Sequence, residues 1–249
     1  MSKKTRLLSL LMRSGEFERS DHAEKEIISG HVSVDGKIVK DPKNSFKINS
    51  VIKVKEHKLE LQNLTYIILN KPKGVICQKS SKEKTIYDII NGIVEIDKKM
   101  KNTLFSIGRL DKDTTGLLIV TNDGQIEKNL TRKEYGILKT YHVKMKSAMK
   151  DDDIERLLGG VRITDDDVGK KFLVKAMEIK KIGKKEIEIV IGEGRKRQIK
   201  KMLKSLGNEV VDLKRVGIGK LRIEDLDFKN KSYLILSESS LEKHIGPAR

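Results

Sequence analysis

A polar loop that runs directly into an apolar strand constrains this chain more than any other feature of its sequence. Residues Leu117–Thr121 are apolar enough for a buried β-strand, and Asn122-Asp123-Gly124 directly after them favours a turn. The loop before this strand carries Asp111, with Arg109 two residues earlier. The pattern therefore predicts one carboxylate at the edge of a sheet, where the loop enters the strand, with an arginine beside it. Taken alone, such an aspartate is more often a turn or capping residue than a catalytic one.

The charge of the chain indicates a polyanionic partner. Its 249 residues include 53 Lys and Arg against 36 Asp and Glu, a formal net charge of +17. An excess of this size attracts nucleic acid. No apolar run approaches the roughly 20 residues that span a bilayer, and the single Cys77 excludes a disulfide within one chain. No signal-peptide core follows the first residues. We therefore expect a cytoplasmic monomer that does not bind membranes.

Residues 1–57 have the pattern of a module of their own. An apolar helical stripe and a second short helix come first, and Asp35-Gly36 then gives a strong signal for a tight hairpin turn. The expected elements are helices at residues 7–11 and 22–29 and strands at residues 32–34, 37–39 and 51–54. The pattern predicts two helices packed on a small sheet.

The pattern changes after a short polar linker at residues 58–63. Strands now alternate irregularly with short helices, which predicts an α+β domain built on an antiparallel or mixed sheet. The expected strands are Leu64–Leu69, Leu117–Thr121, Lys139–Lys146, Phe172–Ile179 and Glu186–Ile191, and the expected helices are Ile126–Leu130, Asp152–Leu158 and Gln198–Leu206.

Positive charge is concentrated in residues 193–222, which contain ten Lys or Arg against three acidic residues. The expected helix Gln198–Leu206 carries an apolar stripe and ends at Gly207, a residue typical of helix C-termini. Because that stripe buries one face, the lysines gather on the other. Such a face is often merely solvated, but concentrated positive charge is also the footprint of phosphate binding.

Four segments carry a family resemblance. The seventeen residues Gly108–Gly124 (GRLDKDTTGLLIVTNDG) resemble the signature of pseudouridine synthases of the RsuA/RluB type. Tyr66–Gly74, Lys139–Val143 and Glu193–Met202 resemble further motifs of this family, in the expected order.

The N-terminal module resembles the S4 RNA-binding domain through Ile27–Gly36 (IISGHVSVDG), although Asp21 stands where that family usually carries basic residues. Together these resemblances imply an S4-like domain at residues 1–57 and a pseudouridine synthase catalytic domain at residues 64–242.

The resemblance also implies roles for particular residues. Asp111 corresponds to the family's nucleophile, Lys200 to the cation that keeps it ionised, and Tyr141 to the tyrosine that stacks on the detached base. Without the motif, Tyr141 would be interpreted as a half-buried strand residue. The expected RNA-binding residues are Arg109, Lys71, Arg195, Lys196, Arg197, Lys201 and Arg215, of which Arg109 would occupy the space of a flipped-out nucleotide or hold its phosphate.

We therefore expect isomerisation of a uridine in ribosomal RNA, preferably of the large subunit and alternatively of the small one. The partner would be ribosomal RNA or a pre-ribosomal particle. The five histidines show no metal-ligand spacing and no phosphate-binding loop is present, so neither metal nor cofactor is expected. The alternative is a non-catalytic RNA-binding or ribosome-assembly factor on the same fold.

Overall fold

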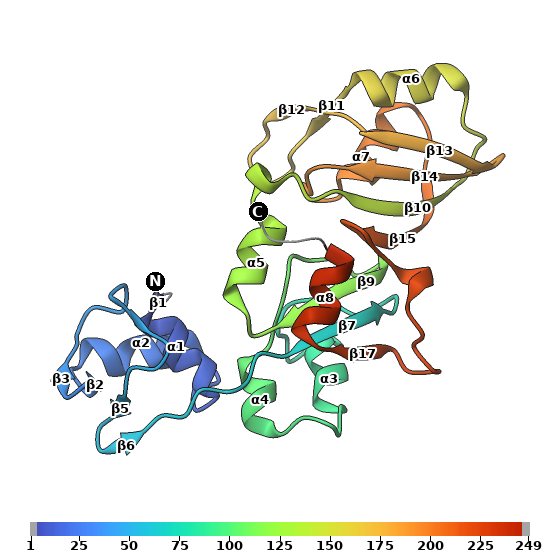
Figure 1. The fold of residues 1–249 in the computed structure, drawn as a ribbon. Coiled ribbons are helices and arrows are strands. Elements are labelled where there is room, and N and C mark those ends of the chain that lie inside the picture. Colours follow the sequence, from blue (N-terminus) through green and yellow to red (C-terminus); the bar gives the residue numbers. More distant parts are fainter. Residues whose placement is uncertain (1–3, 246–249) are drawn as a thin grey trace. The chain divides into compact units, whose positions relative to one another are not determined.

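The computed structural model describes residues 4–245 of the chain (Figure 1). Two compact units interleave along the sequence. The first contains the residues up to Thr65 with 87–105 and 121–124, and the second contains 66–86, 106–120 and the residues from 125 onward. The division into domains at 1–57 and 64–242 assumes continuous segments and stays a prediction. Met1–Lys3 of the first domain lie outside the described residues.

In the first unit, two helices pack on a small sheet. Helices α1 (Leu7–Ser14) and α2 (Ser20–Ile28) bury their apolar faces against strands β2 (Val32–Val34) and β5 (Ile52–Val54) in one hydrophobic cluster. The sheet has the order β3-β2-β5-β6. Both helices and the hairpin are confirmed. Other elements of this unit are β1 (Lys4–Arg6), β3 (Lys37–Ile38), β4 (Ser45–Lys47), β6 (His57–Lys58), most of α3 (Ile86–Asn91) and α4 (Lys98–Thr103).

The turn between β2 and β3 shows why Asp35-Gly36 is informative. Both residues have positive φ, 50° and 81°, as a tight hairpin turn of the primed type requires. The Asp35 carboxylate also accepts a hydrogen bond from the backbone N–H of Val51 at 2.8 Å. Asp35 thereby joins the turn to the segment that leads into β5.

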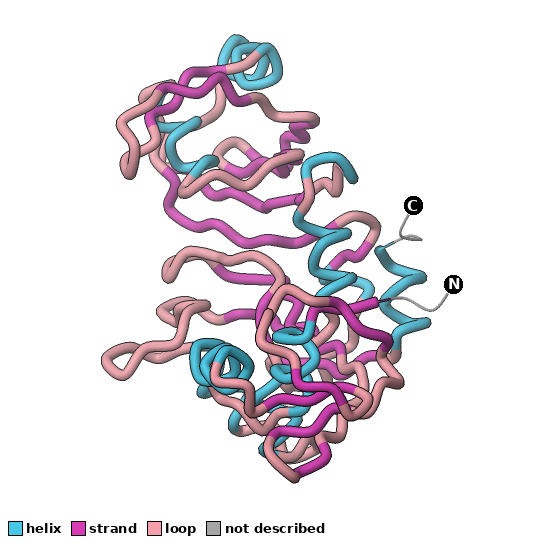
Figure 2. Tube along the Cα trace, turned by 90° about the vertical axis from the view of Figure 1, so that its left-hand side faces the viewer, coloured by secondary structure: helices cyan, strands magenta, loops and turns pink. Residues whose placement is uncertain are grey.

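The second unit is built on a large mixed sheet. Its strands follow the order β13-β14-β10-β15-β9-β7-β17, with β16 beside β15 and β8 beside β9. Strand β15 pairs with β9 in parallel, whereas β10 pairs antiparallel with both β14 and β15. Figure 2 shows several of these strands running side by side. The α+β fold with a mixed sheet is thus confirmed.

Besides the strands of the large sheet, this part of the chain contains a separate two-stranded hairpin and several short helices. The sheet strands are β7 (Tyr66–Lys71), β8 (Phe105–Ser106), β9 (Thr115–Thr121), β10 (Lys139–Met145), β13 (Glu178–Gly183), β14 (Glu186–Ile191), β15 (Val210–Ile218), β16 (Leu221–Arg222) and β17 (Tyr233–Leu236). Strands β11 (Val161–Thr164) and β12 (Lys171–Val174) form a separate hairpin. The helices are α5 (Gly124–Thr131), η1 (Lys133–Tyr135), α6 (Asp151–Gly159), α7 (Gln198–Ser205), η2 (Ile223–Asp225) and α8 (Glu238–Ile245).

Several strands of this sheet differ from the expectation, which did not include β8, β16 or β17. The single strand predicted at Phe172–Ile179 is two strands, because β12 pairs with β11 whereas β13 pairs with β14. Strand β15 was not predicted, although it lies between β10 and β9. Its charged residues Asp212, Lys214 and Arg215 interrupt the apolar pattern by which a central strand is normally found. By contrast, Leu117–Val120 of β9 are completely buried, as predicted.

Candidate active site

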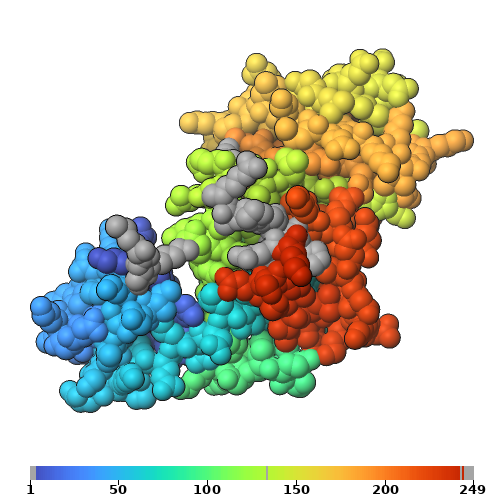
Figure 3. Space-filling view, viewed as in Figure 1, coloured from blue at the N-terminus to red at the C-terminus, as the bar shows by residue number. Residues whose placement is uncertain are grey.

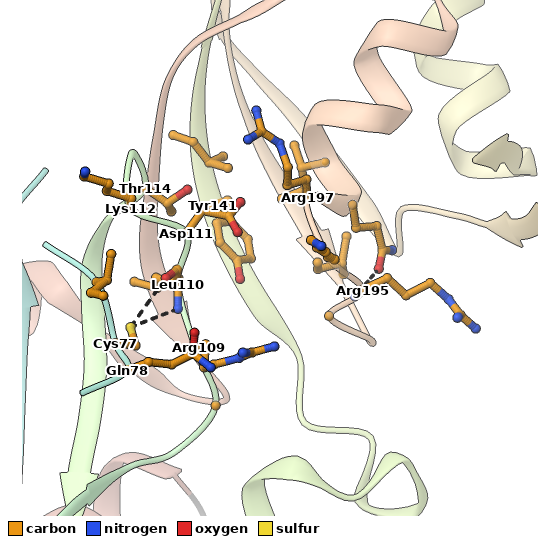
Figure 4. A pocket seen from close by; sticks show the side chains of 18 of the residues that line it. Cys77, Gln78, Arg109, Leu110, Asp111, Lys112, Thr114, Tyr141, Arg195 and Arg197 are labelled. Atoms are coloured by element: carbon orange, nitrogen blue, oxygen red, sulfur yellow. Dashed lines mark hydrogen bonds between the residues drawn. The ribbon is translucent and has the colours of Figure 1, made fainter. Parts of the chain in front are cut away.

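A pocket of about 640 Å³ opens in the second unit (Figure 4). Segments that are distant in sequence line it, chiefly residues 76–78, 108–112 and 194–199, together with Thr114, Tyr141, Asp167, Ile191 and Leu213. The structure brings together six of the predicted site residues in its wall: Arg109, Asp111, Tyr141, Arg195, Lys196 and Arg197. This volume lies in the range of small-molecule sites.

The backbone around Asp111 is fixed on both sides. On the N-terminal side, the Cys77 thiol donates to the Leu110 carbonyl (3.4 Å) and accepts from the Leu110 N–H (3.3 Å). On the C-terminal side, the Gly74 N–H donates to the Lys112 carbonyl and the Thr114 N–H donates to the Asp111 carbonyl. Figure 4 shows the two Cys77 contacts as dashed lines. Sequence reasoning missed this role of Cys77, because only the fold brings residues 77 and 110 together.

The cation next to Asp111 is Lys200, as predicted. Its Nζ lies 3.6 Å from Oδ2 of Asp111, and its side chain is only 13% exposed. Lys200 extends from α7 and therefore reaches the carboxylate from a different element. The ammonium and the carboxylate attract each other across this distance, because Lys200 is largely shielded from solvent.

Lys200 also contacts a second carboxylate that the sequence did not identify. Its ammonium donates a short hydrogen bond to Asp113, two residues after Asp111. Burial acts to raise the pKa of Asp113, but the hydrogen bond and charge of Lys200, together with the charge of Arg197, outweigh burial and hold this pKa below its usual range. Lys200 thus forms ion pairs with two carboxylates of one loop.

Tyr141 lies on β10, the strand between β14 and β15, and is 8% exposed. The pairing of β10 with β15 shifts at this point, since Thr140 opposes Gly217 whereas Tyr141 opposes Arg215. Such bulges re-aim side chains and are frequent beside active sites. Tyr141 lines the pocket, and in the view of Figure 4 the Asp111 carboxylate lies in front of its ring.

The basic motif Glu193–Met202, called the third motif from here on, is held in place by Gln198, the first residue of α7. Its buried amide oxygen accepts from the Arg195 N–H at 2.9 Å, which closes the turn over residues 195–198. Arg197 directly before the helix has a left-handed backbone, φ 54°, a conformation that is strained for a residue with a side chain. Helix α7 ends before Gly207, whose φ is 76°, so the predicted helix end is confirmed.

Two predicted RNA-binding residues are not at the surface. Lys71 has no exposed surface, and its ammonium donates to the carbonyl oxygens of Pro72 (3.0 Å) and Val75 (2.6 Å). Burial lowers its pKa, against the opposing effects of Cys77, Asp113 and Asp111. Arg215 is 5% exposed and donates through Nε to the Leu117 carbonyl. The structure therefore corrects the expected RNA contacts of both residues, because each satisfies backbone carbonyls in the interior.

Residues 4–245 contain no group of three or more His, Cys, Asp or Glu side chains that could hold a metal ion. The expectation that no metal or cofactor is needed stays a prediction. Over the same residues, no helix combines the length and apolar character needed to cross a bilayer.

Comparison with known proteins identifies the family. Residues 65–205 match the model of the RNA pseudouridylate synthases. The chain is 34% identical to the uncharacterised RNA pseudouridine synthase YtzG of Bacillus subtilis, over 88% of this chain and 90% of that protein. It is 34% identical to the ribosomal large subunit pseudouridine synthase B of Bacillus subtilis, over 84% of both chains. Identity to the ribosomal small subunit pseudouridine synthase A of Escherichia coli is 31%, over 88% of this chain and 91% of that protein.

A solved structure supports the same assignment. The crystal structure of a pseudouridylate synthase superimposes with a TM-score of 0.65 and 29% sequence identity, over 96% of this chain and 98% of that one. The chain belongs to the RNA pseudouridylate synthase family.

Proposed function

We propose that this protein isomerises a uridine of ribosomal RNA to pseudouridine, with Asp111 as the nucleophile. The observation that carries this proposal is the position of Asp111 in the wall of the pocket, beside Tyr141 and 3.6 Å from the ammonium of Lys200. Similarity to two enzymes named for ribosomal RNA supports the substrate class. We propose large-subunit RNA as the substrate and small-subunit RNA as the alternative, in line with 34% and 31% identity to the respective enzymes.

The reaction explains why these residue types are needed. The bond between the ribose and N1 of uracil breaks, a new bond forms from the same ribose carbon to C5, and the proton on C5 is exchanged for one on N1. No atom is lost and no electron is transferred, so the reaction needs a nucleophilic carboxylate and a route for one proton. Asp111 supplies the carboxylate, and Lys200 keeps it ionised.

Tyr141 is proposed to hold the detached base during this rearrangement. Tyr141 lies on β10, between two neighbouring strands of the sheet, and lines the pocket. A stacked base can turn in the plane of the Tyr141 ring without leaving the pocket. The phenol can take the proton from C5 while it passes its own hydroxyl proton to N1 or to solvent, so that it ends as a neutral phenol. Because a base inside a helical stem cannot reach Asp111, the nucleotide must be flipped out. Arg109 is exposed and lines the pocket. Its proposed role is to bind the phosphate of the flipped-out nucleotide or to fill the space that this nucleotide leaves.

We also propose that the protein acts as a cytoplasmic monomer on ribosomal RNA or a pre-ribosomal particle. The alternative function, a binding factor without catalysis, is disfavoured by the charge of the pocket. A carboxylate that faces phosphates weakens the binding of RNA, so a protein that only binds RNA gains nothing from Asp111.

The experiment compares pseudouridines in ribosomal RNA treated with the purified protein and with Asp111→Asn. We expect Asp111→Asn to lose activity by more than the factor of ~10²–10⁴ that a missing general acid or base causes, while RNA binding stays equal or tightens. Asp152→Asn on α6, outside the pocket lining, is the matched control. Near-normal turnover by Asp111→Asn would refute the nucleophile, and wild-type protein that binds RNA without isomerising any uridine would favour the binding factor.

A further inference from the structure

The β11–β12 hairpin contacts three basic residues of the third motif. The Lys196 ammonium pairs with Asp167 at 2.6 Å, and the Lys201 ammonium pairs with Asp166 at 2.9 Å. From the same hairpin, the ring of Phe172 lies 3.8 Å from the guanidinium carbon of Arg195. The family resemblance predicts that these three basic residues bind RNA. One hairpin therefore contacts cations that phosphates are expected to bind.

The acidic turn of this hairpin is held by hydrogen bonds within the turn. The Asp167 N–H donates to the Asp165 carboxylate at 3.0 Å, and two backbone hydrogen bonds join Asp165 to Gly169 and Lys170. Figure 3 shows the surface of this part of the chain in yellow to orange. The side chains of Asp166 and Asp167 are about 60% exposed, and that of Lys196 is 50% exposed, whereas that of Lys201 is only 16% exposed. An incoming phosphate can therefore reach Lys196 from solvent, and it reaches Lys201 once Asp166 moves aside.

The ion pairs between the turn and the lysines shift the pKa of Asp166 and the pKa of Lys196. The hydrogen bond and charge of Lys201, with the charges of Lys196 and Arg197, outweigh a smaller opposing effect of burial and hold the pKa of Asp166 below its usual range. The hydrogen bond and charge of Asp167, with the charges of Asp166 and Asp165, raise the pKa of Lys196. Lys196 therefore stays charged, but its charge is partly cancelled while the turn remains in place.

We propose that Asp166 and Asp167 form an electrostatic filter that selects RNA at the mouth of the active site. RNA that fits the pocket places phosphates close enough to displace both carboxylates from Lys201 and Lys196. RNA that does not fit must bind against the repulsion of the two carboxylates and without these two lysines. Exposed ion pairs are weak enough for a well-placed phosphate to exchange with the carboxylate. This inference rests on the proposed function in taking RNA as the ligand.

The test measures the binding of a fluorescent oligouridylate, an RNA without folded structure, by the wild type and by the double variant Asp166→Asn/Asp167→Asn. We expect the variant to bind roughly 3- to 20-fold more tightly at low salt, the range that two exposed ion pairs cover. The logarithm of affinity should also fall more steeply with the logarithm of salt concentration, by about 0.7 per lysine released to bind single-stranded RNA.

A matched control separates this effect from net charge. Asp151→Asn/Glu209→Gln also removes two carboxylates and frees two surface lysines, Lys181 and Lys146, outside the pocket lining. Equal affinities and salt slopes in this control and in the Asp166/Asp167 variant would overturn the filter. The same holds if the Asp166/Asp167 variant loses thermal stability while its RNA affinity stays at the wild-type value, because the carboxylates would then serve only the packing of the hairpin.

Competition in the isomerisation assay gives a second readout. With ribosomal RNA as substrate, unlabelled oligouridylate should inhibit the Asp166→Asn/Asp167→Asn variant at lower concentrations than it inhibits the wild type. Asp166→Glu/Asp167→Glu, which keeps both charges, should restore the wild-type behaviour. Absence of any turnover by the wild type would refute the proposed function, but the binding comparison would still decide whether the filter exists.

Discussion

The ammonium of Lys200 lies 3.6 Å from the carboxylate of Asp111, yet it makes its shortest contact with another carboxylate, that of Asp113. The position of Lys200 is therefore set by the loop as a whole and not by Asp111 alone. The contact with Asp113 holds the ammonium within reach of the proposed nucleophile. Asp113 is thus a positioning residue, and its replacement is not a neutral control for the replacement of Asp111.

Replacing Lys200 should separate the effect of its charge from that of its shape. Lys200→Met removes the cation from Asp111 and Asp113, so two neighbouring carboxylates are left unpaired. We expect turnover to fall about 10²-fold or more, the scale of a lost electrostatic partner in an active site. Lys200→Arg keeps the charge and should retain most of the activity. The measurement is single-turnover isomerisation of ribosomal RNA, and equal rates for Lys200→Met and wild type would contradict the assigned role.

The Asp113–Lys200 pair should make stability depend on pH in the acid range. Because the folded state lowers the pKa of Asp113, the pair stabilises the fold fully above the ordinary value of 3.8 and loses this effect as pH falls through the lowered pKa. The melting temperature of Asp113→Asn should therefore lie slightly below that of the wild type near neutral pH, and the difference should disappear in strong acid. A difference that is constant over the whole pH range would show that the pair is not its cause.

Cys77 should affect catalysis through the placement of Leu110. Cys77→Val removes both hydrogen bonds to the Leu110 backbone directly before Asp111. Because small misplacements of a reacting group can lower rates by up to about 10²-fold, we expect kcat to fall roughly 10- to 100-fold with little change in KM. Cys77→Ser keeps a donor and acceptor at the same position and should recover much of the rate. A loss shared equally by both variants would point to the size of the sulfur atom and not to its hydrogen bonds.

Substitution of Gly116 should destabilise the fold, because a side chain at this position would clash with the neighbouring backbone. Its φ is 101°, and a Cβ atom there would lie 2.2 Å from the carbonyl oxygen of Arg215, where β9 and β15 run in parallel. Gly116→Ala should therefore lower the free energy of unfolding by at least about 3 kcal/mol. Gly124→Ala is the control, since a Cβ atom meets nothing within 4 Å there and alanine favours the helix. Chemical denaturation of both variants would measure the difference, and equal stabilities would contradict the close approach.

The sequence predicts the local elements of this protein well, because each rests on neighbouring residues. The turn at Asp35-Gly36, the buried strand that includes Leu117 and the helix that begins at Gln198 are found where the patterns place them. The motif around Asp111 also indicated the family, which the comparisons with known proteins confirm.

The sequence was less informative where a residue serves a partner far along the chain. Arg215 is a basic residue in a basic segment, and nothing local shows that it is buried against the Leu117 carbonyl. Lys71 precedes a proline in a loop-like segment, yet its ammonium binds two carbonyl oxygens in the interior. The charge of both residues predicted RNA contacts, whereas burial between elements gives them structural roles.

The sequence by itself thus determined the class of enzyme, the identity of the proposed nucleophile and the basic character of the third motif, since these depend on residue types at fixed spacing. Only the tertiary structure decided which partners those residues have. It placed Cys77 against Leu110, Asp113 against the ammonium of Lys200, and Asp166 and Asp167 against Lys201 and Lys196. The physical reason is that hydrogen bonds and ion pairs act over a few ångströms in space, and only the folding of distant strands and loops brings these groups within that range.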